Sequence, residues 1–303
     1  MAVHSPMNSR LTRRDSLKLL AAGSAFARYA AGQTALASAK IADNFTLISG
    51  AGSNVLLFTS PEGNLLVDGG SPEHTADLVN LAQPVKVLIN THWHYESTGS
   101  NEALGKAGAK IIAHEKTKLW LGAELDIHWT GKQFNPLPKI ARPTETFYTT
   151  KKLTFGGQAI EAGYLLQAHT DSDIYVHFQQ ANILMVGDAV SPGRYPDLDW
   201  STGGWITGMV DAQKLLLDLA NDQTKIIAGV GPVITKADLQ VSYDKLVVLR
   251  DAILKSFRQG KTPQEMFDEG LTKDYAAQGD AKVFLQNAYR GMWGHVREVG
   301  GIV

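Results

Sequence analysis

The chain contains no cysteine among its 303 residues. This absence excludes disulfides, thiolate metal ligands and thiol nucleophiles, so any metal must be bound by histidine, aspartate or glutamate. The chain also has no marked excess of one charge, because its 29 Lys and Arg residues nearly balance its 30 Asp and Glu residues. The resulting net charge of −1 gives no reason to expect nucleic acid or an anionic membrane as a partner.

Internal repeats and low-complexity segments are absent too, and 44% of the residues are hydrophobic. This composition is typical of a soluble globular protein that buries a sizeable core. We expect a single domain over residues 40–303, preceded by a leader at residues 1–39. The oligomeric state cannot be read from the sequence.

The N-terminus has the features of a targeting segment. Arginines within residues 10–14 precede a mildly apolar, Ala-rich run over residues 17–37 that ends in small residues, as at a signal cleavage site. The stretch Thr12-Arg-Arg-Asp-Ser-Leu-Lys18 looks like a twin-arginine export signal. An uncleaved amphipathic helix or membrane anchor is the alternative.

The apolar run is weak and is interrupted by Arg28, which disfavours stable membrane insertion. We therefore expect a mature chain that begins near Ser38 or Lys40. It would be exported in the folded state to the bacterial periplasm.

Two histidines follow the apolar run Val85–Ile89, which is rich in β-branched residues and reads as a buried strand. Residues two apart in extended backbone point the same way, so His92, His94 and the carboxylate of Glu96 can converge on one point. This spacing suits a metal ion, since imidazole nitrogens bind zinc at about 2.0–2.1 Å. Two partly exposed histidines in a polar loop, without a metal, are the alternative.

Further motifs downstream make the chain similar to the metallo-beta-lactamase superfamily. In that family, a strand ending in Thr-His-x-His-x-Asp-His precedes a lone His, an Asp after an apolar strand, and a His in a Gly-His-Gly-Pro turn. The matching stretches here, in the same order, are Thr91-His92-Trp93-His94-Tyr95-Glu96-Ser97, Ala168-His169-Thr170, Leu184-Met-Val-Gly-Asp188 and Gly229-Val230-Gly231-Pro232. The resemblance runs from about Asn44 to about Leu239.

The resemblance implies an α/β fold, an αββα sandwich of two mixed β-sheets between helices. The alternation of strand-like and helix-like segments, repeated once in each half, agrees with this architecture. Apolar spacing after about residue 235 predicts a helical C-terminal extension.

The first zinc site of the family is complete in this sequence. The resemblance implies that His92, His94 and His169 are the nitrogen ligands of one zinc ion, with a fourth position open to water or to Asp188. Three histidines and an open position are typical of catalytic zinc, which lowers the pKa of its bound water to about 7. We expect one zinc per chain.

The second zinc site of the family departs from the pattern. Its ligands would be Glu96, Ser97, Asp188 and Val230, and a valine cannot bind a metal. Glu96 and Asp188 could hold a weaker, oxygen-preferring second ion such as Mn²⁺. His128, in an irregular segment, is the residue that could replace a missing ligand.

Three further features have alternative interpretations. Asp68 is either a second-shell residue near the metal loop, as the resemblance implies, or a turn former before Gly69. We expect His114 to be structural rather than a ligand. The segment Trp120–Pro143, which shows no clear period, is a candidate flap that faces the substrate.

Two classes of function follow. The first is an exported hydrolase that uses a single zinc-bound hydroxide on a small ester-, lactam-, lactone- or thioester-type substrate, with Glu96 or Asp188 orienting or deprotonating the water. The second is a metal-binding relative without turnover that binds a ligand or partner. The sequence leaves the substrate open.

Overall fold

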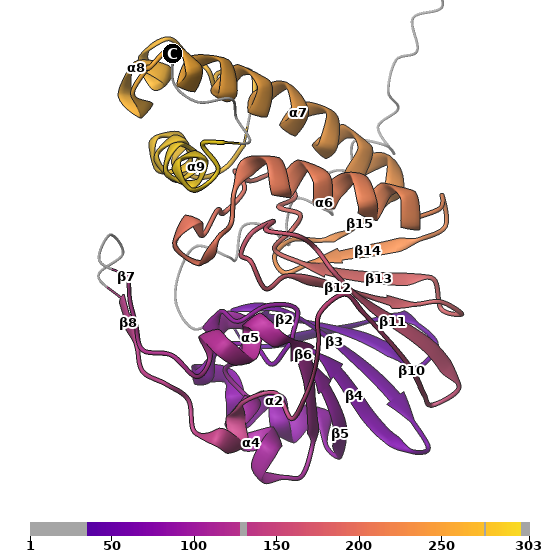
Figure 1. The fold of residues 1–303 in the computed structure, drawn as a ribbon. Coiled ribbons are helices and arrows are strands. Elements are labelled where there is room, and N and C mark those ends of the chain that lie inside the picture. The colour runs from indigo at the N-terminus through magenta and orange to yellow at the C-terminus, as the bar shows by residue number, and fades with distance from the viewer. Residues whose placement is uncertain (1–34, 128–131, 276, 298–303) are drawn as a thin grey trace, which may run out of the picture.

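The protein is described by a computed structural model, which covers residues 35–127, 132–275 and 277–297. Two β-sheets pack face to face, and helices cover the outer face of each (Figure 1). The predicted αββα sandwich is therefore confirmed, as is its helical C-terminal part.

The first sheet is formed by the N-terminal half of the chain. Its strands follow the order β1-β2-β3-β4-β5-β6-β9, with β4, β5, β6 and β9 parallel to one another and the rest antiparallel. The strands are β1 (Ala37–Ala42), β2 (Phe45–Ala51), β3 (Ser53–Ser60), β4 (Gly63–Val67), β5 (Val85–Ile89), β6 (Lys110–His114) and β9 (Glu145–Phe147).

The second sheet follows the chain order β10 to β15, and only its β13–β14 pair is parallel. A separate two-stranded hairpin is formed by β7 and β8. These strands are β7 (Leu125–Ile127), β8 (Lys132–Phe134), β10 (Thr150–Phe155), β11 (Gln158–Tyr164), β12 (Ile174–Phe178), β13 (Ile183–Gly187), β14 (Lys225–Ala228) and β15 (Val233–Ile234).

Helices form the two outer layers. Residues of α2 and α4 pack on the first sheet, and residues of α6 to α9 pack on the second. The helices are η1 (Pro72–His74), α2 (Thr75–Ala82), α3 (Tyr95–Thr98), α4 (Asn101–Lys106), α5 (Glu115–Trp120), η2 (Lys139–Ala141), η3 (Trp200–Thr202), α6 (Ile206–Leu219), α7 (Lys236–Arg258), α8 (Pro263–Asp268) and α9 (Ala281–Gly294).

Buried strands of this sandwich carry apolar residues on both faces, because side chains alternate between the two sides of a sheet. In β13, Ile183 and Met185 enter the core between the sheets, whereas Leu184 and Val186 enter the core under the helices. The central core includes a cluster of phenylalanine rings, with Phe45 and Phe58 stacked at a centroid distance of 4.6 Å. This packing explains why the strand segments read as continuous apolar runs.

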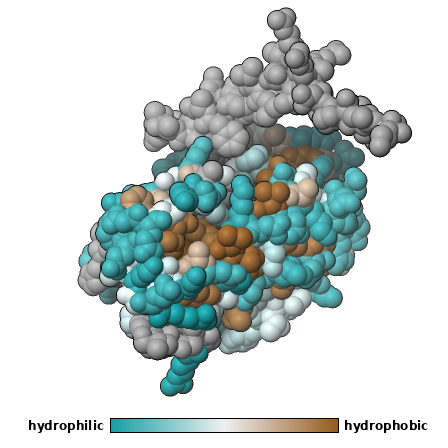
Figure 2. Space-filling view, turned by 90° about the horizontal axis from the view of Figure 1, so that it is seen from above, coloured by the Kyte–Doolittle hydropathy of each residue, from teal (hydrophilic) through white to brown (hydrophobic). Residues whose placement is uncertain are grey.

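Seen from above, the helical side of the molecule shows apolar residues framed by hydrophilic ones (Figure 2). Exposed apolar side chains of this layer include Val241 and Val248 of α7 and Val283 of α9. Among the described helices, none has both the length and the apolar composition needed to cross a lipid bilayer.

The structure refines two of the expected segments. The stretch 146–150, which reads from the sequence as a single short strand, contains the end of β9 in the first sheet and the start of β10 in the second. The segment Trp120–Pro143 is not wholly irregular, because it contains the β7–β8 hairpin and η2. Strand β1 begins at Ala37, so cleavage near Ser38 or Lys40 would shorten this edge strand.

Strand ends place the predicted site at one end of the sandwich. β5 ends three residues before His92, β11 ends five residues before His169, and β13 ends directly before Asp188. The two halves meet there, because the Ile174 amide at the start of β12 donates to the Thr91 carbonyl at 2.8 Å.

Candidate metal centre

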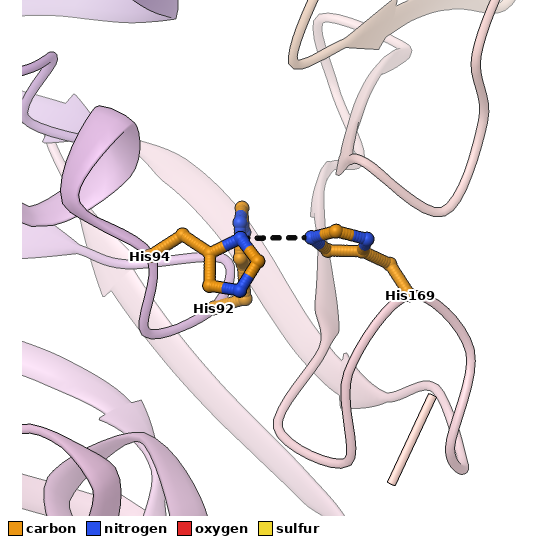
Figure 3. A group of neighbouring side chains, drawn as sticks. All are labelled: His92, His94 and His169. Carbon is orange, nitrogen blue, oxygen red and sulfur yellow. Dashed lines mark hydrogen bonds between the residues drawn. The ribbon is translucent and has the colours of Figure 1, made fainter. Parts of the chain in front are cut away.

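Three histidine side chains meet between the two halves of the fold. His92 and His94 approach from the loop after β5, and His169 approaches from the loop after β11 (Figure 3). Each ring offers a nitrogen, and the three atoms lie within 4.8 Å of one another. Nδ1 of His94 and Nε2 of His169 are 3.0 Å apart. The structure therefore brings together the three ligands predicted from the sequence.

The ring of His92 is oriented by the preceding residue. Its Nδ1 lies 3.0 Å from Oγ1 of Thr91, so Nε2 is the nitrogen left for a ligand. Within the described residues this buried Nε2 has no hydrogen-bond partner. Burying a polar atom without a partner costs free energy, and a metal ion at this position would remove that cost.

Asp68 supports His92 indirectly, by binding Thr91. Its carboxylate accepts from the Thr91 amide and from the Thr91 hydroxyl, each at 2.8 Å. Asp68 adopts a left-handed φ of 65°, a conformation that costs a non-glycine residue about 1 kcal/mol or more. Burial raises the pKa of this carboxyl. Asp68 therefore supports a ligand, as the resemblance implied.

His94 is oriented by a carboxylate from the other half of the chain. Its Nε2 lies 3.1 Å from Oδ2 of Asp199, which leaves Nδ1 facing His169 and, at 3.2 Å, Oε1 of Glu96. Asp199 also accepts hydrogen bonds from the hydroxyls of Ser201 and Thr202. Burial alone would raise the pKa of Asp199, but the hydrogen bond and charge of His94, together with the two hydroxyls, hold this pKa well below its usual range.

The backbone orients the third histidine. Nδ1 of His169 donates to the carbonyl of Asp197 at 2.7 Å, so Nε2 faces the other two rings. Each of the three histidines thus has one nitrogen fixed by a neighbour and the other directed to a common point. Partners of this kind fix the ring orientation of metal-binding histidines. The donor set fits a metal ion, and three neutral nitrogens are typical of zinc.

The protonation of the histidines differs between positions. Burial lowers the pKa of His92 well below its usual value, and the neighbouring His169 and His94 add to this effect. Burial opposes protonation of His94 as well, but the hydrogen bonds with Asp199 and Glu96 outweigh it and raise the pKa of His94. These hydrogen bonds therefore favour a protonated His94 in the metal-free site, and a metal that binds Nδ1 would have to displace that proton.

A second, overlapping group contains the two carboxylates that the sequence singled out. One ligand atom each of His92, Glu96 and Asp188 lies within 4.8 Å of the others. Asp188 is 4.0 Å from Nε2 of His169 but belongs to this group rather than to the three-histidine group. Gly229 leaves room for it, because a Cβ there would lie 1.9 Å from Oδ1 of Asp188.

The other positions of the expected second site provide no imidazole. Ser97 is buried, and its hydroxyl has no hydrogen-bond partner among the residues that the structure describes. Val230 is half-buried in a loop that Asn54 holds by donating to the carbonyls of Ala228 and Gly231 at 2.8 and 2.9 Å. His128, the possible substitute, lies outside the described residues.

The remaining predicted features also have defined places. The ring of His114 stacks on Tyr164 at 4.1 Å and its Nε2 contacts the Tyr148 carbonyl at 2.9 Å, which agrees with the structural role expected for it. The candidate flap packs partly on the loop that carries His92 and His94, because Leu137 and Phe134 contact the small apolar cluster around the buried Trp93.

Two observations were not anticipated from the sequence. Asp199 lies 105 residues from His94, in a loop without a periodic pattern, so no local signal connects them. Glu96 lies in the short helix α3 rather than in extended backbone. Its side chain still approaches the histidines, with Oε1 3.2 Å from Nδ1 of His94.

A comparison with protein families matches residues 48–250 to the metallo-beta-lactamase superfamily. The chain belongs to this superfamily. The match begins within β2, covers the remaining strands of both sheets and ends within α7, so β1, α8 and α9 lie beyond it. A comparison with curated protein sequences found no match.

Solved structures show the same superfamily fold. A metallo-beta-lactamase from Pontibacter korlensis is 24% identical, with a TM-score of 0.56, over 70% of this chain and 99% of its own. The stereoselective inverting sec-alkylsulfatase Pisa1 from Pseudomonas sp. is 15% identical, with a TM-score of 0.66, over 88% of this chain and 55% of its own. A metallo-beta-lactamase from Hirschia baltica is 17% identical, with a TM-score of 0.55, over 70% of this chain and 97% of its own.

Proposed function

We propose that this superfamily member is a hydrolase that uses a single zinc ion bound by His92, His94 and His169. The observation that supports this proposal most strongly is that each of these rings has one nitrogen held by a neighbour and the other directed to a shared point. When bound, zinc supplies a hydroxide near neutral pH and polarises the bond under attack. The substrate would be a small ester, lactam, lactone or thioester.

The two carboxylates have different environments, which suggests different roles. Burial raises the pKa of Asp188, which makes it the better suited of the two carboxylates to take up a proton from the attacking water. Burial acts in the same direction on Glu96, but its hydrogen bond with His94 holds its pKa well below the usual range. Glu96 therefore remains ionised and orients the water.

Turnover assays on a panel of substrates test the proposal. The purified protein should hydrolyse at least one member of a panel of carboxylic esters, lactams, lactones and thioesters. A secondary sulfate ester should be included, because the sulfatase matches more of this chain than the lactamases do. The double variant His92→Ala, His94→Ala, which lacks two of the three nitrogens, is the control and should be inactive.

The alternative is a metal-binding protein that has lost turnover and binds a small ligand or partner. Its support is the second site, in which a hydroxyl and an alkyl group replace two imidazoles. Zinc binding by the wild type without turnover of any substrate on the panel would favour this alternative.

For the location, we propose export to the bacterial periplasm through the twin-arginine segment. Residues 1–34 lie outside the described residues, so the proposal rests on the sequence. Mass spectrometry of the natively expressed protein should find an N-terminus near Ser38 or Lys40 in the periplasmic fraction. An intact N-terminus in the cytoplasmic fraction would contradict it.

A further inference from the structure

The C-terminal helix α9 packs against the loop that supports the metal centre. The guanidinium of Arg290 lies over the ring of Trp200, 5.1 Å from its centroid. Trp200 begins η3 and directly follows Asp199, the partner of His94. Among the described residues, Arg290 forms no ion pair with a carboxylate.

The same helix holds the other end of this loop. The rings of Trp205 and His295 stack with centroids 3.8 Å apart and planes 8° from parallel. Gly291 allows the close approach, because a Cβ at this position would lie 3.0 Å from the Gly204 carbonyl oxygen. α9 thus contacts the loop at Trp200 and again at 204–205.

Inside the loop, Thr202 connects these contacts to the histidines. Its hydroxyl donates to Oδ2 of Asp199 at 2.5 Å and accepts from Nε1 of Trp93 at 3.2 Å. Its carbonyl accepts from the amide of Asp171 at 2.8 Å. Trp93 and Asp171 flank His94 and His169, so one short turn is bonded to both halves of the site.

We infer that α9, which lies beyond the family match, is part of the metal centre's support and that Arg290 is a positioning residue for His94. It acts through Trp200 and Asp199 and touches neither metal nor substrate. A cation over a tryptophan face is a favourable contact, and a carboxylate that orients a metal-binding histidine affects metal affinity. This inference rests on the proposed zinc site.

Zinc affinity and the visible spectrum of the cobalt-substituted protein test the role of Arg290. Direct partners of ligands typically change metal affinity about 10–100-fold. For Arg290→Gln, one contact further away, we expect zinc affinity roughly 3- to 10-fold weaker and an altered cobalt spectrum. Arg290→Lys keeps the cation and should stay within about twofold of the wild type.

A matched control is present on the same helix. Lys282 lies over the ring of Phe267, 4.6 Å from its centroid, and Phe267 belongs to α8 rather than to the loop that carries Asp199 and Trp200. Lys282→Gln removes the same kind of contact and should leave zinc affinity and the cobalt spectrum unchanged. A purely structural role for Arg290 predicts that both variants lower the thermal midpoint and that neither changes the two metal readouts.

Two further measurements separate the possible failures. In metal-free protein, Arg290→Gln should speed hydrogen exchange of the Trp93 indole N–H, which donates to Thr202. Trp200→Leu should weaken zinc binding as Arg290→Gln does, and the double variant should be little worse than either. The inference would be overturned if Arg290→Gln kept the zinc affinity, cobalt spectrum and indole exchange of the wild type. It would also be overturned if the losses of zinc affinity in Arg290→Gln and Trp200→Leu were fully additive in the double variant. A wild type that binds no zinc would instead refute the proposed function.

Discussion

Nε2 of His94 lies 3.1 Å from Oδ2 of Asp199, across 105 residues of sequence and between the two halves of the fold. This contact determines which nitrogen of His94 faces the other histidines. The carboxylate that orients the ligand is itself held by the hydroxyls of Ser201 and Thr202. The metal centre therefore depends on a loop that provides no metal ligand of its own.

Asp199→Asn should weaken zinc binding by about 10–100-fold. Both carboxylate oxygens of Asp199 accept hydrogen bonds. The amide of asparagine has only one accepting oxygen, and its NH₂ group would face donors that now bond the second carboxylate oxygen. Competition with a zinc chelator measures the change. Asp218→Asn, at an exposed carboxylate paired with Lys214, is the control, and equal losses in both variants would contradict the role of Asp199.

Zinc binding near pH 7 should release a proton from His94. The pKa of His94 is raised in the metal-free site, so the ring is charged below that pKa and must become neutral to bind a metal. Zinc affinity should accordingly rise with pH until the pH reaches the pKa of His94, and should level off above it. Calorimetry in buffers with different ionisation enthalpies counts the protons, and Asp199→Asn should release fewer. No proton release by the wild type would show that His94 is already neutral.

Thr91→Val should destabilise the protein by about 1–3 kcal/mol, because Asp68 loses a donor and Nδ1 of His92 loses its acceptor in a buried site. Thr91→Ser keeps the hydroxyl and should cost only about 0.8 kcal/mol for the lost methyl group. Denaturant unfolding of the metal-free proteins measures both. Equal destabilisation by the two substitutions would indicate that packing, rather than the hydroxyl, is what Thr91 contributes.

The second metal site should be rebuilt by three substitutions. Ser97→His and Val230→His supply two imidazoles, and Glu96→Asp restores the usual length of the carboxylate facing Asp188. Four nitrogen and oxygen donors are sufficient for a second zinc, so elemental analysis should give a value that rises from one towards two. A folded triple variant with an unchanged thermal midpoint and one zinc would show that Val230 does not correspond to the family ligand.

Much of this structure follows from sequence patterns of short range. Apolar runs such as Val85–Ile89 predict the buried strands. The resemblance to the superfamily, rather than a short-range pattern, implies that His169 joins His92 and His94. The role of Asp199 could not be predicted in this way, because its only link to His94 is made by the fold. The helical conformation of Tyr95–Thr98 was missed because a spacing of two residues is also the pattern of extended backbone.

The central claim is that one zinc ion, held by three histidines, is sufficient for activity. Its most direct test is to titrate metal-free protein with zinc and to measure bound zinc and hydrolysis of a panel substrate at each step. Activity should reach its maximum at one equivalent and stay level beyond it. Activity that rises only between one and two equivalents, or zinc binding without any activity, would contradict the account.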